Sequence, residues 1–105
     1  MRKKGIKVVY LFWGMRIRWQ ESKRQLVLRK RKIDLADLED LLCVPYIEDQ
    51  RSDNPEQYRI IGFAAGRVVT FIVEYREDDL GEFIWVVTAW KSTKQERETY
   101  EKETR

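Results

Sequence analysis

The sequence of 105 residues contains no histidine and a single cysteine, Cys43. Catalysis by a histidine general base is therefore excluded. A zinc site is excluded as well, because it needs a cluster of cysteine and histidine ligands, and we expect neither a metal nor a cofactor. One cysteine cannot form a disulfide within the chain, which favours a cytoplasmic protein.

Long apolar runs are also missing, since no uncharged run exceeds eight residues. A membrane-spanning helix needs about twenty apolar residues, so we expect no membrane association. The apolar run Val8–Trp13 follows a basic start, as in a signal peptide, but no small-residue cleavage site comes after it. We therefore predict an N-terminal extension over residues 1–14 and a single domain over 15–105. An edge strand over Ile6–Phe12 is the alternative.

Charge is abundant and unevenly distributed, although the net charge is only +3. Residues 1–32 hold twelve Lys and Arg against one acidic residue, Glu21, whereas residues 33–56 hold eight Asp and Glu against one Arg. Six of the ten residues 23–32 are basic. A basic front segment of this kind favours a surface that binds a polyanion, with RNA or DNA as the leading candidates.

The most informative stretch lies near the C-terminus. Phe83–Trp90 carries no charge and is mostly β-branched or aromatic, which is typical of an inner strand buried on both faces. The polar segment after it has helical spacing. Thr93 followed by Glu96 is a capping-box pattern, with Ser92 as an equally good N-cap, and either predicts that a helix begins near Ser92.

The rest of the chain predicts an α+β fold of order β-α-α-β-β-β-α, an antiparallel sheet with its helices packed on one face. The predicted elements are a short strand at Ile17–Trp19, a basic helix over Glu21–Lys32, and a second helix with Asp34 as N-cap and Leu35, Leu38 and Leu42 inward. The acidic segment Tyr46–Glu56 is turn-rich and predicts a loop, with room for a short edge strand at Tyr46–Glu48 that the stated order does not count. Strands follow at Gln57–Phe63, Arg67–Tyr75 and Phe83–Trp90, with turns at Ala64–Gly66 and Glu77–Gly81.

From about Arg16 to Glu103 the chain resembles the BrnT toxin family, whose members have a RelE-like fold and belong to type II toxin–antitoxin systems. The likeness is carried by the sequences Ile17-Arg18-Trp19, Leu28-Arg29-Lys30-Arg31-Lys32-Ile33-Asp34, Glu56-Gln57-Tyr58-Arg59-Ile60-Ile61-Gly62, and Ile84-Trp85-Val86-Val87-Thr88-Ala89-Trp90-Lys91 followed by Glu96-Arg97 and Tyr100-Glu101. Two positions depart from the family pattern: Arg31 stands where a histidine is usual, and Trp90 where an arginine is usual.

The resemblance implies a metal-independent ribonuclease that cleaves RNA and inhibits translation. It also implies a cognate DNA-binding antitoxin similar to BrnA as the partner, with paired copies in the toxin–antitoxin complex. Such an antitoxin often contacts its toxin through acidic or amphipathic segments, so the basic surface would serve both partners.

RNA cleavage without a metal requires a base, an acid, and cations for the negative charge that develops on phosphorus. The predicted catalytic residues are Arg59 and Lys91 as phosphate clamps, Lys30 as a further cation, and Glu96 and Tyr100 for proton transfer. The predicted RNA-binding residues are Lys23, Arg24, Arg29, Arg31, Lys32, Trp90 and Arg97, with Trp90 stacking on a base.

Each of these assignments has a structural alternative. Trp90 is also typical of a core residue at the end of a strand, and Arg59 of an ion pair with a cross-strand carboxylate such as Glu74. Glu96 and Tyr100 are four residues apart and are expected to be neighbours on the surface of a helix. The basic run 23–32 is also compatible with a solvated helix face.

Three functions therefore remain open from the sequence. The first is the ribonuclease toxin, and the second is a module that binds nucleic acid or antitoxin on the same fold with weakened or lost catalysis. The third is a small regulatory domain whose basic helix binds a partner protein. Salt-dependent binding of RNA separates the second from the third, because release of counterions gives a steep salt dependence.

Overall fold

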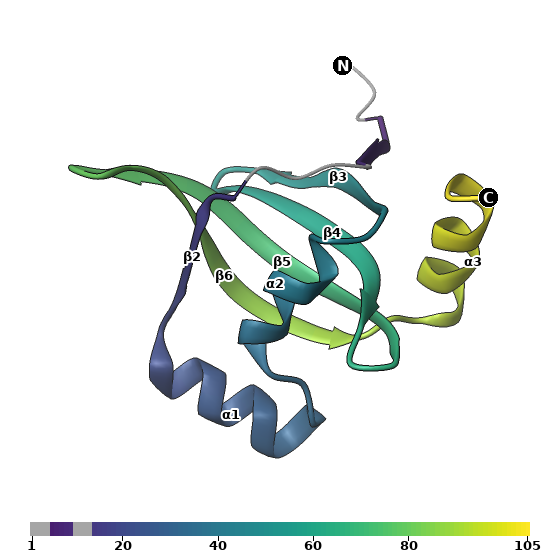
Figure 1. Cartoon of the computed structure of the whole chain (residues 1–105), viewed down its shortest axis with the longest axis horizontal. Helices are drawn as coiled ribbons and strands as arrows, with labels where there is room; N and C mark the ends of the chain where they lie inside the picture. Colours follow the sequence, from purple (N-terminus) through teal and green to yellow (C-terminus); the bar gives the residue numbers. More distant parts are fainter. Residues whose placement is uncertain (1–4, 10–13) are drawn as a thin grey trace.

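A computed structural model of the chain describes residues 5–9 and 14–105. Six strands form one curled sheet, and helices lie on both of its faces (Figure 1). The α+β class predicted from the sequence is confirmed. The elements in chain order are β1 (Lys7–Val9), β2 (Arg16–Trp19), α1 (Glu21–Arg31), the one-turn 3-10 helix η1 (Leu35–Asp37), α2 (Leu38–Leu41), β3 (Tyr46–Asp53), β4 (Glu56–Ala64), β5 (Arg67–Asp78), β6 (Gly81–Lys91) and α3 (Lys94–Glu103).

The three predicted C-terminal strands are present as an antiparallel meander, β4–β5–β6. The turn between β4 and β5 consists of Ala65 and Gly66, and both have positive φ angles of 52° and 82°. This pair of left-handed residues matches the twist of the flanking strands, which is why a two-residue hairpin closes here. The second predicted turn also lies where expected, between Asp78 and Gly81.

Two features of the sheet differ from the prediction. The strands run in the order β1-β3-β4-β5-β6-β2, and β2 pairs with β6 in parallel, so the sheet is mixed and not wholly antiparallel. The crossover through α1, η1 and α2 carries the chain from one edge strand to the far side of the sheet. In addition, β3 continues through Asp53, where the sequence predicted a loop, because a register shift between Gln50 and Ser52 keeps it paired with β4.

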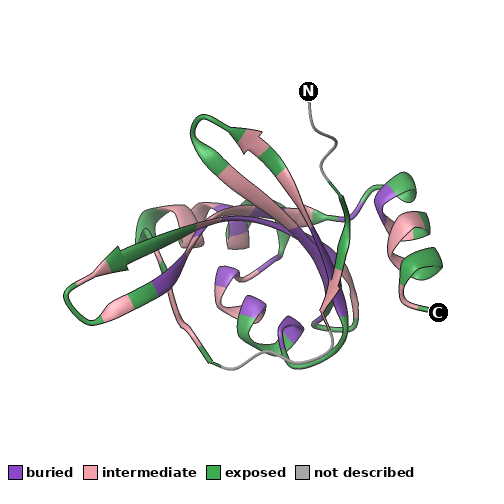
Figure 2. Cartoon of the chain, turned by 90° about the horizontal axis from the view of Figure 1, so that it is seen from above, coloured by how far each residue is buried: buried purple, intermediate pink, exposed green. Residues whose placement is uncertain are grey.

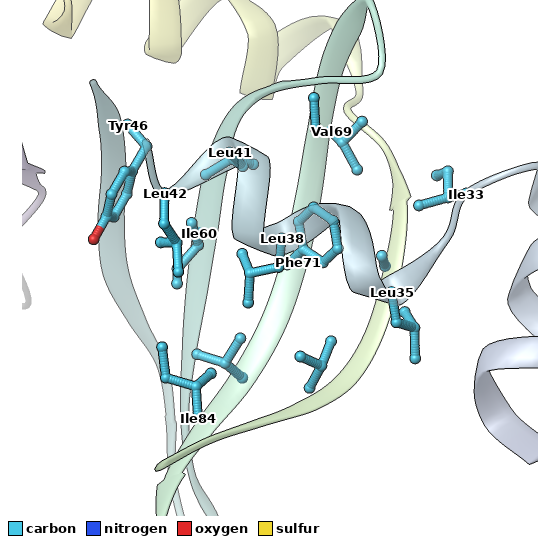
Figure 3. Close-up of a cluster of buried hydrophobic side chains, with 14 of the residues drawn as sticks. Ile33, Leu35, Leu38, Leu41, Leu42, Tyr46, Ile60, Val69, Phe71 and Ile84 are labelled. Atoms are coloured by element: carbon cyan, nitrogen blue, oxygen red, sulfur yellow. The ribbon is translucent and has the colours of Figure 1, made fainter. Parts of the chain in front are cut away.

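The main hydrophobic core lies between η1–α2 and one face of the sheet (Figure 3). Leu35 and Leu38 are completely buried and Leu42 is buried, as the apolar stripe predicted, and they face Ile60 of β4 and Phe71 of β5. Leu41, which the stripe did not include, is also completely buried. Asp34 caps η1, and its side chain accepts a hydrogen bond from the amide of Ala36.

One glycine allows α2 to lie this close to the sheet. A Cβ atom on Gly62 of β4 would lie 2.8 Å from Cγ of Leu41 and 3.0 Å from Cβ of Tyr46. No real Cβ atom tolerates the first of these distances, so Gly62 is required here for space. The sequence pattern gives no sign of this close approach.

The predicted packing of every helix on one face is wrong for α3. Neighbouring residues of a strand point to opposite faces, so Ile60 points into the core under α2 whereas Arg59 and Ile61 point the other way. The carboxylate of Glu96 in α3 lies 3.5 Å from Nη1 of Arg59, so α3 packs on the face opposite α2. Figure 2 shows α2 enclosed by the curled sheet and α3 outside it.

The predicted N-terminal extension, residues 1–14, is described only in part, because residues 1–4 and 10–13 lie outside the described residues. Within the described part, Lys7–Val9 forms β1 and pairs with Tyr46–Glu48 of β3. In the described part of the chain, no helix has the length and apolar character needed to cross a membrane.

Candidate functional site

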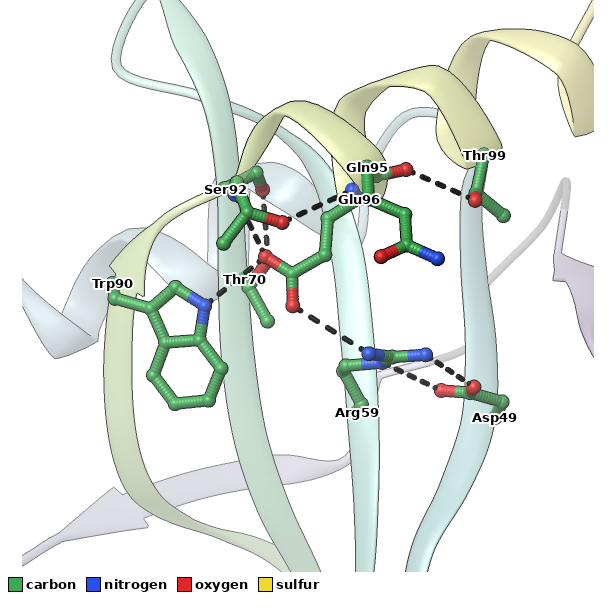
Figure 4. Close-up of polar contacts among 9 residues, drawn as sticks. Asp49, Arg59, Thr70, Trp90, Ser92, Gln95, Glu96 and Thr99 are labelled. Carbon is green, nitrogen blue, oxygen red and sulfur yellow. Dashed lines mark hydrogen bonds and ion pairs between the residues drawn. The ribbon is translucent and has the colours of Figure 1, made fainter.

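The carboxylate of Glu96 is the centre of a polar network between α3 and the sheet (Figure 4). Its Oε1 atom accepts hydrogen bonds from Nε1 of Trp90 at 3.1 Å and from Oγ1 of Thr70 at 3.0 Å. The backbone amide of Thr93 donates to the same oxygen at 2.9 Å. Oε2 faces Arg59, whose Nη1 atom is 3.5 Å away.

The capping box of α3 holds Glu96 in this position. The Thr93 side chain accepts from the amide of Glu96, and the Glu96 side chain accepts from the amide of Thr93, as the sequence predicted. Glu96 is buried. Burial alone would raise the pKa of its carboxyl, but the hydrogen bonds from Thr93, Trp90 and Thr70 and the charge of Arg59 outweigh it, so the pKa is lowered.

Arg59 is bound on both sides by carboxylates. Its Nε and Nη2 atoms donate to the two carboxylate oxygens of Asp49 at 3.0 and 2.6 Å, and Nη1 faces Glu96. The hydrogen bonds to Asp49 raise the pKa of Arg59, and Glu96 adds to the effect. Two carboxylates therefore neutralise the guanidinium of Arg59, which we predicted from the sequence to be a phosphate clamp.

A small polar pocket of about 210 Å³ lies beside this network. Its lining combines charged and neutral polar groups from β4 and α3 with one isoleucine. The lining residues are Arg59, Ile61, Thr93, Gln95, Glu96 and Thr99. Because the charged groups already satisfy one another, the pocket offers no free cation to an anionic ligand.

A second set of charges gathers around the C-terminal end of α1. We call it the α1-end patch and define it by six cations: Arg29, Lys30, Arg31, Lys32, Arg67 and Lys91. Arg31 donates to the carbonyl of Ala89 at 2.8 Å and to Oγ1 of Thr88 at 3.3 Å, which ties α1 to β6. Within the described residues, none of the six forms an ion pair with a carboxylate.

The folding of the chain brings these six cations together. Lys32 ends α1 in a left-handed conformation, with φ of 60°, and Arg67 at the start of β5 donates to the carbonyl of Lys32. Lys91 at the end of β6 pairs with Val69 of β5, two residues after Arg67. Five of the six come from the predicted site, and Arg67 is an addition.

The predicted catalytic residues do not converge on one point. Arg59 and Glu96 lie together on the α3 face, whereas Lys91 is opposite Val69, whose side chain belongs to the core on the other face. Lys30 is exposed on α1. The Tyr100 hydroxyl donates to the carbonyl of Pro45 at 3.4 Å, and burial raises the pKa of this phenol.

Three of the remaining predicted RNA-binding residues have partners within the protein. Arg24 of α1 is bonded to Asp34 and Glu21, and Arg97 donates to the carbonyl of Ser92 at 2.8 Å. Trp90 donates to Glu96 and is half-buried outside the main hydrophobic core. Lys23, by contrast, has no such bond in the part of the chain that the structure describes.

Sequence reasoning missed Asp49, Thr70 and Arg67. The sequence predicts a loop at Asp49, so it does not reveal that Asp49 lies opposite Arg59 in the β3–β4 pair. Thr70 is a polar residue in an apolar strand. This pattern does not tell a buried hydroxyl from an exposed one. Among the described residues, no group of three or more possible metal ligands is found.

The fold and the two charged regions define a small α+β domain with a curled mixed sheet, a buried acidic network and a basic patch. Its family follows from the sequence. Residues 24–91, more than half of the chain, match the family described as Domain of unknown function (DUF4258). The chain therefore belongs to the DUF4258 family. No curated protein matches it.

Proposed function

We propose that this chain binds RNA through the α1-end patch, as a toxin-like module on which RNA cleavage is weakened or lost. The observation that carries the proposal is the concentration of six cations, none of which forms an ion pair among the described residues. Arg67 interacts with Asp37 only through its charge. Elsewhere on the molecule, Arg16, Arg24, Arg59 and Arg76 are each bonded to a carboxylate. The patch thus concentrates positive charge that forms no ion pair with a carboxylate of the described residues.

Physical chemistry favours a polyanion as the ligand of such a patch. Exposed lysines and arginines that bind phosphates release condensed counterions, and this release supplies most of the affinity of non-specific nucleic-acid binding. The basic last turn of α1 also lies at the negative end of the helix dipole, which stabilises the cations there. The dipole therefore offsets part of the repulsion among these cations.

The ribonuclease toxin implied by the BrnT resemblance is the second candidate function. One observation favours it: Arg31 and Lys91 flank the same end of β6, so part of the predicted cation set shares one location. Against it, Arg59 and Glu96 lie on the opposite face of the sheet and neutralise each other. Under this candidate the protein is a cytoplasmic BrnT-type toxin whose antitoxin, similar to BrnA, binds it in a complex of paired copies.

The binding of a labelled single-stranded RNA to the full chain, measured by fluorescence anisotropy over a range of salt concentrations, tests the proposal. We expect affinity to fall steeply with salt, with a slope that becomes shallower by about 0.7 for each phosphate contact removed. Arg29→Gln and Lys30→Gln remove two exposed cations of the patch. Lys102→Gln, an exposed cation on α3, is the matched control and should leave the slope unchanged. Absence of binding at low salt would contradict the proposal.

Induced expression separates the two candidates. A ribonuclease toxin arrests growth and degrades RNA, and Lys91→Ala should relieve both effects because Lys91 is exposed and is not needed by any described ion pair. Arg59→Ala is less informative, since it also leaves Asp49 without its partner. Normal growth with folded, RNA-binding protein supports the module without cleavage. Binding of acidic peptides but not RNA would instead favour the regulatory domain.

A further inference from the structure

A bulge in β6 places two tryptophans on the same face of the sheet. Ile72 of β5 pairs with Thr88, but the next residue, Val73, pairs with Val86, so Val87 is an extra residue. Trp85 and Trp90 are five residues apart and would point to opposite faces of a regular strand. With the bulge between them, both point away from the core that contains Val86 and Ala89.

The partners of the two tryptophans confirm this shared face. Trp90 donates to Glu96 of α3. Trp85 is opposite Glu74 of β5, and Glu74 accepts a hydrogen bond from Gln57, two residues before Arg59 on β4. Because α3 packs against β4 and β3, it leaves the Trp85 end of this face uncovered. Figure 4 shows α3 lying over one end of the strands only.

Arginine side chains cover the aromatic rings of this face. The guanidinium carbon of Arg76 is 4.5 Å from the ring centroid of Trp85, and that of Arg51 is 5.5 Å from the ring centroid of Trp90. Arg18 stacks in the same way on Phe83 at 4.9 Å. We call these six residues the arginine–aromatic face. In such cation–π contacts the guanidinium group lies over the face of an aromatic ring, which attracts it electrostatically.

The charge that this face presents to solvent is positive. Arg76 and Arg18 have side chains that are 44% and 52% exposed, whereas their carboxylate partners Glu74 and Asp78 are 17% and 33% exposed. The carboxylates are thus more buried than the guanidinium groups that they bind. Arg51 is exposed, and within the described residues it has no ion pair.

We propose that the arginine–aromatic face binds unpaired bases of single-stranded RNA by stacking. This inference rests on the proposed RNA-binding function and names the form of RNA that it recognises. Proteins that bind single strands combine aromatic and guanidinium planes, on which bases stack, with cations that follow the backbone. In a duplex the bases are stacked on each other and have no free face to offer.

The face is continuous with the α1-end patch at the open edge of β6. The strand β2 pairs with β6 only as far as Val86, so the edge beyond that point is free of a neighbouring strand among the described residues. Arg31 reaches from α1 across this edge to Thr88, which lies on the same face as Trp90. An RNA strand can therefore place phosphates on the patch while its bases turn over the edge onto the tryptophans.

Substitution of Trp85 in the full chain tests this inference, with oligouridylate as the single-stranded probe and a duplex of equal length as the comparison. Trp85→Leu should weaken binding of the single strand roughly 5- to 150-fold, as measured losses of base stacking do. Trp85→Phe retains a ring and should retain most of the affinity. Duplex affinity and the salt slope should not change, because no phosphate contact is removed. Unchanged single-strand affinity in folded Trp85→Leu would overturn the inference.

Cross-linking of the wild-type chain gives a second test that does not depend on a variant folding. Oligouridylate carrying 5-iodouracil is bound and irradiated, and the adducts are mapped by mass spectrometry. Adducts on the peptides that contain Trp85 and Trp90 support stacking on this face. If the chain binds RNA with steep salt dependence but forms adducts only on α1, the inference fails and the proposed function stands. If the chain binds no RNA, the proposed function itself fails.

Discussion

The two faces of the sheet are stabilised by different forces. On one face, η1 and α2 bury Leu35, Leu38 and Leu41 against a continuous apolar surface. On the other face, α3 contributes Glu96 as its only buried residue and is held by hydrogen bonds and an ion pair. Apolar packing is non-directional and tolerates variation, whereas a buried carboxylate requires each of its partners in place. The comparison predicts different responses to substitution, to pH and to loss of a helix cap.

The largest effect is expected on the apolar face. Leu38 is completely buried under the sheet, so Leu38→Ala removes its transfer free energy and leaves a cavity. We expect a loss of about 2–5 kcal/mol in the free energy of unfolding, measured by urea denaturation. Leu80→Ala is the matched control, because Leu80 at the β5–β6 turn is 81% exposed and its truncation should cost almost nothing. A loss of unfolding free energy in Leu38→Ala as small as that in Leu80→Ala would show that α2 contributes little to stability.

A smaller but more specific effect is expected at Glu96. Glu96→Ala leaves Trp90 and Thr70 without their acceptor and Arg59 without its second carboxylate. Loss of hydrogen bonds to a charged group costs about 1.5–3 kcal/mol. Urea denaturation should show this loss, and Glu96→Gln should recover part of it because its amide oxygen still accepts hydrogen bonds. Equal stability of the wild type and Glu96→Ala would mean that α3 is not held by this network.

Acid should weaken the polar contacts that hold α3 on the sheet before it weakens the apolar packing of α2. The pKa of Glu96 is lowered in the folded protein from its ordinary value of 4.5, so its charge stabilises the fold above that pH. This stability is lost as the pH falls through the folded-state pKa. In Glu96→Gln the position has no proton to gain, so the acid limb of a plot of unfolding free energy against pH should flatten. A limb with the same slope would assign acid sensitivity to other carboxylates, such as Asp34 beside Arg24.

The same contrast explains how much could be predicted from the sequence. The stripe of Leu35, Leu38 and Leu42 and the uncharged run of β6 are periodic patterns, and the elements they predicted are present. The parallel pairing of β2 and the place of α3 depend on contacts between residues far apart in the sequence, and no local pattern encodes them. Arg59 shows this most clearly: its residue type left a free cation and a cross-strand ion pair open, and only the pairing of β3 with β4 identifies Asp49 as its partner.

The smallest effect should separate the cap of α3 from its network. Thr93→Ala removes the side-chain oxygen that accepts from the amide of Glu96, at 3.1 Å, but leaves the bonds from Trp90 and Thr70 to Glu96 intact. Loss of a threonine cap costs about 1 kcal/mol. If the cap only starts the helix, the losses from Thr93→Ala and Glu96→Gln should add in a double variant. If the cap also positions the carboxylate, the double variant should lose less than the sum, because Thr93→Ala has already loosened the network that Glu96→Gln disrupts.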